Sequence, residues 1–195
     1  MEKTIEIKNG FLTVEISSLG AEIVSIKDRD GNDRQWNGGP AVWRGRAPIM
    51  FPICGGLQND TLKFGGKEYP LKKHGFAKLM NFECESAGKD SAVFLLRSNE
   101  ETKKQYPFDF EMRAEFRLSD NSIEITYSVK NPSGSEIFFS FGGHEAYACP
   151  DGIDNYSVIF EKEEPLDATA LDGNYLTYEK NHISDNGRID LNEEY

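Results

Sequence analysis

Strict alternation of apolar and polar residues is the feature that most constrains how this chain can fold. It is clearest in MRAEFRLSDNSIEITYSVKN, residues 112–131. The apolar positions there are Met112, Ala114, Phe116 and Leu118 before Ser119-Asp120-Asn121, and Ile123, Ile125, Tyr127 and Val129 after it. Side chains of a strand alternate between its two faces, and Ser, Asp and Asn are typical turn residues. The pattern therefore predicts an antiparallel hairpin with one buried face.

Shorter runs repeat this pattern along the chain. TIEIKNGFLTVEISS alternates around Asn9-Gly10, and SAVFLLRS and YSVIFEK are further predicted strands. No stretch shows an apolar stripe of useful length at helical spacing. We therefore predict an all-β fold, a sandwich in a single domain over residues 1–195, with a polar tail after residue 165.

Charge and cysteine usage restrict the partners and the compartment. The formal net charge is -11, which disfavours nucleic acid and an anionic membrane surface as partners. Cys54, Cys84 and Cys149 form neither a disulfide framework nor a zinc motif. The charged N-terminal residues do not resemble a signal peptide, and no apolar stretch is long enough to cross a bilayer. We expect a soluble cytoplasmic protein.

Two of the three histidines stand in distinctive surroundings. His144 ends an aromatic run in FSFGGHEAYACP, where Gly142 and Gly143 leave the backbone open to close approach. An imidazole suits proton transfer, although a structural histidine beside a bulge is an equal alternative. His74, in EYPLKKHGFAKLMNFE, alone suggests a surface loop, and so does His182 among polar neighbours.

The segment AVWRGRAPIMFPICGGL combines Trp43 with Arg44 and Arg46. Sugars stack their C–H faces on aromatic rings and bind polar groups through their hydroxyls. This set is therefore a candidate substrate site, and the alternative is an edge loop with solvated arginines and a core tryptophan. A glycosidase with paired carboxylates also stays open, because Asp and Glu are plentiful.

Taken together, these segments resemble the aldose 1-epimerase (galactose mutarotase-like) family, in particular its bacterial LacX-like branch. The resemblance starts at LGAEIVSIKDRDGNDRQWNG, continues through VWRGRAPIMFPICGGL, and is sharpest at YPLKKHGFAK and FGGHEAYACP. It implies a β-supersandwich and an isomerase that interconverts the α and β anomers of a hexose or hexose phosphate through a ring-opened aldehyde. It also implies catalytic roles for His144, as the acid at the ring oxygen, and for His74, which binds the sugar and stabilises developing charge. Arg44 or Arg46 would hold hydroxyls, and the resemblance implies that no metal or organic cofactor is needed.

Departures from the family pattern lead to alternative interpretations of what the chain does. The resemblance implies a C-terminal glutamate base, which has no counterpart here, so we expect the C-terminal part of the family fold to be absent. The chain would then be a non-catalytic carbohydrate-binding protein, an inactive fragment, or a structural β domain, unless Glu145 or Asp151 replaces the base. A sandwich without its last strands exposes a sheet edge, so we expect a homodimer that covers this edge, or poor solubility.

Overall fold

The structure, a computed structural model, describes residues 2–39, 41–173 and 175–192, and its regular elements are almost all strands. The chain divides into two compact units, Met1–Ala148 and Cys149–Tyr195. That both belong to one domain over residues 1–195 stays a prediction.

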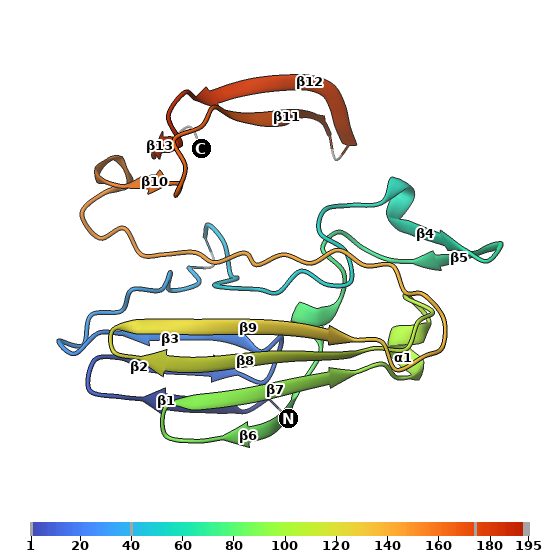
Figure 1. The fold of residues 1–195 in the computed structure, drawn as a ribbon, viewed down its shortest axis with the longest axis horizontal. Coiled ribbons are helices and arrows are strands. Elements are labelled where there is room, and N and C mark those ends of the chain that lie inside the picture. Colours follow the sequence, from blue (N-terminus) through green and yellow to red (C-terminus); the bar gives the residue numbers. More distant parts are fainter. Residues whose placement is uncertain (1, 40, 174, 193–195) are drawn as a thin grey trace. The chain divides into compact units, whose positions relative to one another are not determined.

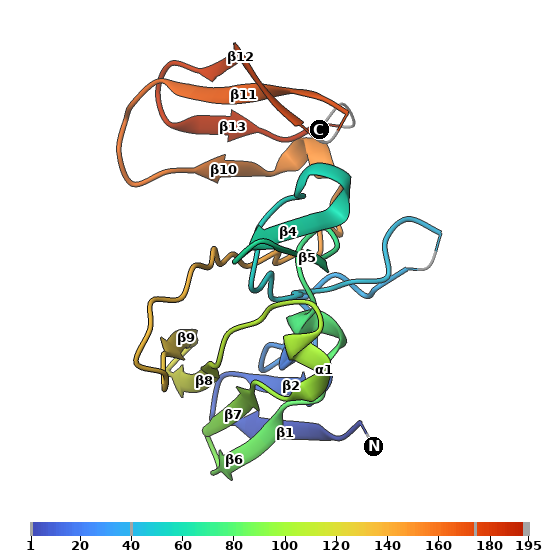
Figure 2. The same ribbon diagram turned by 90° about the vertical axis from the view of Figure 1, so that its right-hand side faces the viewer.

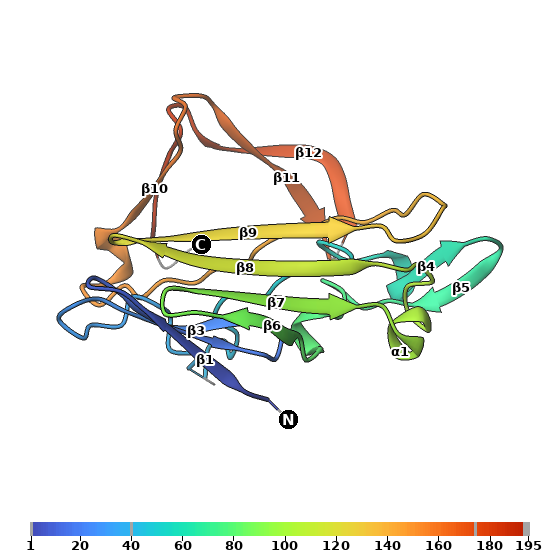
Figure 3. The ribbon, with the colours of Figure 1, turned by 60° about the horizontal axis from the view of Figure 1, so that its bottom comes forward.

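The first unit is built on a four-stranded antiparallel sheet in the order β6-β7-β8-β9 (Figures 1 and 3). Its strands are β6 (Glu83–Ala87), β7 (Ser91–Arg97), β8 (Glu111–Ser119) and β9 (Ser122–Lys130). Ser119 pairs with Ser122 around a two-residue turn, in which Asp120 has φ 49°. All four apolar residues predicted to face inward on β8 are buried, so the predicted hairpin is confirmed.

A second sheet covers the apolar face of the first. It consists of β1 (Thr4–Lys8), β2 (Thr13–Ser17) and β3 (Glu22–Lys27), in that order. Figure 2, which looks along the strands, shows the two layers, with β1 near β7. Side chains from both sheets form one core, among them Ile7, Val14, Ile16, Phe94, Met112 and Phe116. Burial of this shared apolar surface is what holds the sheets together.

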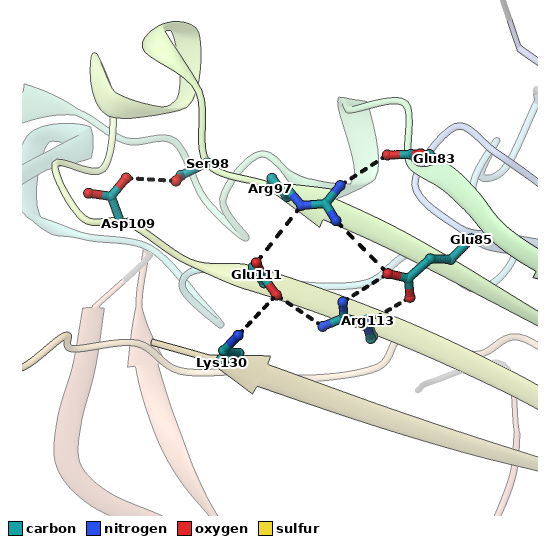
Figure 4. A network of polar contacts seen from close by, with 8 residues as sticks. All are labelled: Glu83, Glu85, Arg97, Ser98, Asp109, Glu111, Arg113 and Lys130. Carbon is teal, nitrogen blue, oxygen red and sulfur yellow. Dashed lines mark hydrogen bonds and ion pairs between the residues drawn. The ribbon is translucent and has the colours of Figure 1, made fainter. Parts of the chain in front are cut away.

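The opposite face of the four-stranded sheet carries a network of charged side chains (Figure 4). At its centre Arg113 donates two hydrogen bonds of 2.8 Å to the two carboxylate oxygens of Glu85. The Arg113 guanidinium thereby lowers the pKa of Glu85. The other members are Glu83, Arg97, Glu111 and Lys130. Exposed pairs of this kind contribute little individually, but the network keeps this face solvated.

Short elements lie in the connections between the strands of the two sheets. Strands β4 (Thr61–Phe64) and β5 (Lys67–Pro70) form a hairpin around Gly65 and Gly66, which both have positive φ. The one α-helix among the described residues, α1 (Glu100–Lys103), lies between β7 and β8 and is capped by the Asn99 side chain. Single 3₁₀ turns lie at Gln58–Asp60 and Ala77–Leu79. Nowhere in the described ranges is there a helix with the length and apolar character that a membrane span requires.

The second unit contains two strand pairs. Strand β10 (Ser157–Ile159) pairs with β13 (Arg188–Asp190), and β11 (Leu166–Asp172) pairs with β12 (Tyr175–Ser184). A 3₁₀ turn, Ile153–Asn155, precedes them. His182 lies on β12, where its ring contacts Asp167 and Asp185 at 3.1 Å each. The hydrogen bond with Asp167 is the main reason why the pKa of His182 is raised.

Candidate functional site

A cavity of about 420 Å³ in the first unit brings together His74 and His144, which are far apart in the sequence. Trp43 lies on its wall with them. The remaining lining residues are Glu22, Gly45, Pro48, Met50, Lys73, Lys78 and Leu79. The cavity therefore joins three of the five residues predicted for the site, and it combines an aromatic surface with ionisable groups.

Backbone hydrogen bonds on either side of His144 hold it at this cavity. Gly142 and Met50 exchange two bonds of 2.8 and 3.1 Å, and the Ala146 N–H donates to the Arg46 carbonyl at 2.8 Å. The two segments run antiparallel, so His144 lies opposite Pro48. Proline has no N–H to donate, and the ladder is interrupted at the position where the histidine projects.

Gln35 ties the same two segments together from behind. Its side chain is buried, and its Nε2 donates to the Arg46 and Ala146 carbonyls at 2.8 and 2.7 Å. A buried amide that satisfies two carbonyls fixes their spacing. Three stretches of chain, around residues 35, 46 and 146, thus converge to position His144.

The glycines before His144 serve packing within the protein. A Cβ on Gly142 would lie 2.7 Å from Cε of Met50 and 3.2 Å from Sγ of Cys54. The sequence predicts that Gly142 and Gly143 leave the backbone open to close approach. In the structure the Met50 side chain, which itself lines the cavity, takes that space.

His74 is held in an unusual backbone conformation. Its φ is 67°, and its own N–H donates to the Gly55 carbonyl at 2.8 Å. The Gly55 N–H in turn donates a hydrogen bond of 3.1 Å to Nδ1 of the His74 ring. Because Nδ1 accepts a hydrogen bond, the neutral ring carries its proton on Nε2.

The surroundings of His74 favour this neutral form. Burial lowers the pKa of His74, and the positive charges of Lys78, Lys73 and His144 lower it further. At neutral pH the ring is therefore a fixed hydrogen-bond donor through Nε2. Such a donor can stabilise negative charge that develops on a bound ligand.

Aromatic contacts complete the wall of the cavity. The Trp43 and His144 rings lie 4.7 Å apart between centroids at an interplanar angle of 36°. The His74 and His144 rings are 6.2 Å apart and nearly perpendicular. A Cβ on Gly45 would lie 2.5 Å from Cζ2 of Trp43, so only glycine allows the indole to keep this position.

The two candidate arginines lie elsewhere. Arg46 uses its guanidinium inside the protein, where Nη1 donates to the Val24 carbonyl and Nη2 donates to the Asn37 carbonyl at 2.9 Å. Arg44 is exposed. Neither is among the described residues that line the cavity. A role for either in holding sugar hydroxyls stays a prediction.

Neither of the two substitute bases considered from the sequence is among the described residues that line the cavity. Glu145 lines a different hollow with Ile125 and Tyr147. Burial raises the pKa of Tyr127, and the negative charge of Glu145 raises it further. Asp151 belongs to the second unit, where it accepts a hydrogen bond from the Tyr156 hydroxyl at 3.3 Å.

Three charged lining residues, Glu22, Lys73 and Lys78, were not proposed as site residues from the sequence. The lysines flank His74 in the motif and could have been included on that ground. No local sequence motif identifies Glu22, because its carboxylate is positioned by hydrogen bonds with the backbone of residues 46 and 47.

Comparison with solved structures defines the class of protein. The chain superposes on the galactose mutarotase related enzyme from Lactobacillus acidophilus with a TM-score of 0.94 and 33% identity, covering 98% of this chain and 66% of that one. A galactose mutarotase-like protein from Lactobacillus casei gives a TM-score of 0.89 and 27% identity, covering 97% and 67%. The fold is the all-β, galactose mutarotase-like fold that the sequence predicts.

The sequence comparisons name the family. The aldose 1-epimerase family model matches residues 3–192. The plasmid-encoded protein LacX of Lactococcus lactis is 35% identical over 171 residues, which cover 83% of this chain and 57% of LacX. This chain belongs to the aldose 1-epimerase family and is LacX-like, which confirms the resemblance. It spans 57% of the length of this curated relative.

Proposed function

We propose that this chain carries the sugar-binding and acid-donating part of an aldose 1-epimerase that acts on a hexose or hexose phosphate. The observation that carries the proposal is the cavity in which His74 and His144 converge beside Trp43. Membership of the aldose 1-epimerase family supports a small sugar as the ligand. The indole offers a surface on which the C–H face of a pyranose can stack.

The proposed reaction divides the proton transfers between separate groups. A base takes the proton from the anomeric hydroxyl, the bond between the anomeric carbon and the ring oxygen breaks, and His144 protonates that oxygen. The product is an open-chain aldehyde with a free hydroxyl, which recloses on the other face after rotation of the C1–C2 bond. His74 donates through Nε2 to an oxygen that gains negative charge.

Positive charge in the cavity bears on the choice of sugar. Lys73 and Lys78 both line it, and both lower the pKa of His74. Ammonium groups bind phosphate well, so the lysines favour a hexose phosphate over a neutral hexose. The anomers of glucose, galactose and glucose 6-phosphate are therefore compared in the test.

The test is anomer exchange measured by NMR, in a buffer that is itself a poor proton-transfer catalyst. We expect the protein to accelerate exchange above the buffer rate, His144→Ala to abolish the acceleration, and His182→Ala to retain it, since His182 is not among the described residues that line the cavity. Equal rates for wild type and His144→Ala contradict the proposed acid. Saturable binding with no exchange selects the alternative, a carbohydrate-binding protein without turnover.

Two further expectations stay proposals. A cytoplasmic location is supported by Cys54, Cys84 and Cys149, which are all free thiols, because disulfides are rare in reducing compartments. We also expect a homodimer that covers an exposed sheet edge, because the unpaired backbone groups of an edge strand tend to pair with another chain. Light scattering tests it, and a monodisperse monomer contradicts it.

A further inference from the structure

Glu22 is the acidic residue among the cavity-lining side chains, and the proposed reaction does not use it. It begins strand β3 and is half-buried. Its Oε1 accepts two backbone hydrogen bonds, from the Arg46 N–H at 2.6 Å and from the Ala47 N–H at 2.8 Å. The carboxylate is thus anchored to the segment that also positions Trp43 and His144.

This anchoring leaves one oxygen available. A carboxylate oxygen can accept about two hydrogen bonds, and the two N–H groups occupy Oε1. Within the described ranges Oε2 has no hydrogen-bond partner, and no buried side-chain oxygen there is left unpaired. Oε2 is therefore accessible. The bonds to Oε1 hold the carboxylate in place before any ligand binds, so little side-chain entropy is lost on binding.

The cavity wall carries both positive and negative side chains, and they are attached to different parts of the wall. Lys78 and Lys73 act electrostatically on His74, whereas Glu22 is attached to the backbone of residues 46 and 47. A ligand with a negative group is attracted to the lysines and repelled by Glu22. Hydroxyl groups can donate to Glu22, so the two kinds of charge define one orientation for a sugar.

We propose that Glu22 is a specificity-determining residue that accepts a hydrogen bond from a sugar hydroxyl through Oε2. The inference rests on the proposed function in one respect, namely that a sugar occupies this cavity. A site built to pair with a hydroxyl rejects the analogue that lacks it, because the buried polar group then loses its partner.

The matched variant is Glu22→Gln. Its amide oxygen can still accept from both backbone N–H groups, while the amide NH₂ replaces Oε2 and donates where the carboxylate accepted. We expect unchanged thermal stability and a Kd for the sugar raised about tenfold to a hundredfold, the range for a hydrogen bond to a charged group. KM should rise with it, and kcat should change far less. Glu124→Gln, at an exposed position on β9, is the control.

A series of monodeoxy sugars gives a second, independent readout on the unmodified protein. One member should bind wild type at least about tenfold more weakly than the parent sugar, and Glu22→Gln should not distinguish the two. The inference is overturned if every deoxy sugar binds wild type like the parent, if Glu22→Gln binds like wild type, or if wild type binds no sugar.

The outcomes for Glu22 and for the proposed function are distinguishable. Exchange that persists with identical kinetics in Glu22→Gln refutes the Glu22 contact alone. Binding that depends on Glu22 without any anomer exchange refutes turnover alone.

Discussion

Gly75→Ala should disrupt the attachment of His74 more severely than other glycine substitutions of the same backbone type. A Cβ at this position would lie 2.2 Å from the Phe51 carbonyl oxygen and 2.7 Å from the Pro52 nitrogen. These are backbone atoms, which cannot rotate away. The Phe51 carbonyl also accepts hydrogen bonds from the N–H groups of Phe76 and Ala77 at 3.0 and 3.1 Å. A displacement of this carbonyl would therefore weaken or break both hydrogen bonds.

The expected cost follows from these two effects. Gly75 has φ 64°, and a left-handed conformation costs a residue with a Cβ about 1–2 kcal/mol. Two lost hydrogen bonds add about 0.5–1.5 kcal/mol each. We therefore expect the free energy of unfolding, measured by urea denaturation, to fall by about 2–5 kcal/mol. The ¹⁵N resonances of the His74 ring should shift as well.

Gly65→Ala is the matched control. Gly65 has φ 58° and no atom within 4 Å of its hypothetical Cβ, so it pays the conformational cost of about 1–2 kcal/mol and no steric cost. If both variants lose the same free energy of unfolding, Gly75 does not lie as close to Phe51 as described. The proposed attachment of His74 would then be wrong as well.

Three other perturbations test separate parts of the site. The lowered pKa of His74 means that the unfolded chain binds a proton that the folded chain does not, so stability should fall as pH drops below 6.5, the ordinary pKa of histidine. In an NMR titration His74 should have a midpoint below 6.5 and His182 one above it, and the reverse order contradicts the assignment. Arg46→Ala should lower the free energy of unfolding by about 1–3 kcal/mol through two lost hydrogen bonds, whereas Arg44→Ala should stay within about 0.5 kcal/mol; equal effects in urea denaturation would refute the structural role of Arg46. Trp43→Ala should weaken sugar binding about tenfold in calorimetry through the loss of its stacking surface, and an unchanged Kd would place the sugar elsewhere.

Local pattern predicted much of the first unit. The hairpin of β8 and β9 follows from alternation and turn residues alone, because one face of β8 is buried, one face of β9 is half-buried, and the opposite faces are more exposed. The second unit was harder to predict. Strands β11 and β12 lie in the segment treated as a polar tail; most of their residues are exposed, none is buried, and β12 shows no clear alternation of burial.

Long-range contacts explain what the sequence could not predict about the site. The residues around His144 form none of the named strands, and they pair with other segments through isolated bridges at Gly142 and Tyr147. Glu22 reaches the cavity wall because its carboxylate binds the backbone of residues 46 and 47. Such pairings depend on the packed fold. His144 is a candidate from its local sequence, whereas a role for His74 came only from the family resemblance.

The measurement that tests the central claim most directly uses the histidines themselves, since the chain has only three. Protein labelled with ¹⁵N at its histidine rings is titrated with galactose, glucose or glucose 6-phosphate. If a sugar occupies the cavity, the resonances of His74 and His144 shift together with one Kd, and those of His182 stay in place. Rings of His74 and His144 that do not respond to any of these sugars would contradict the assignment of this cavity as the sugar site.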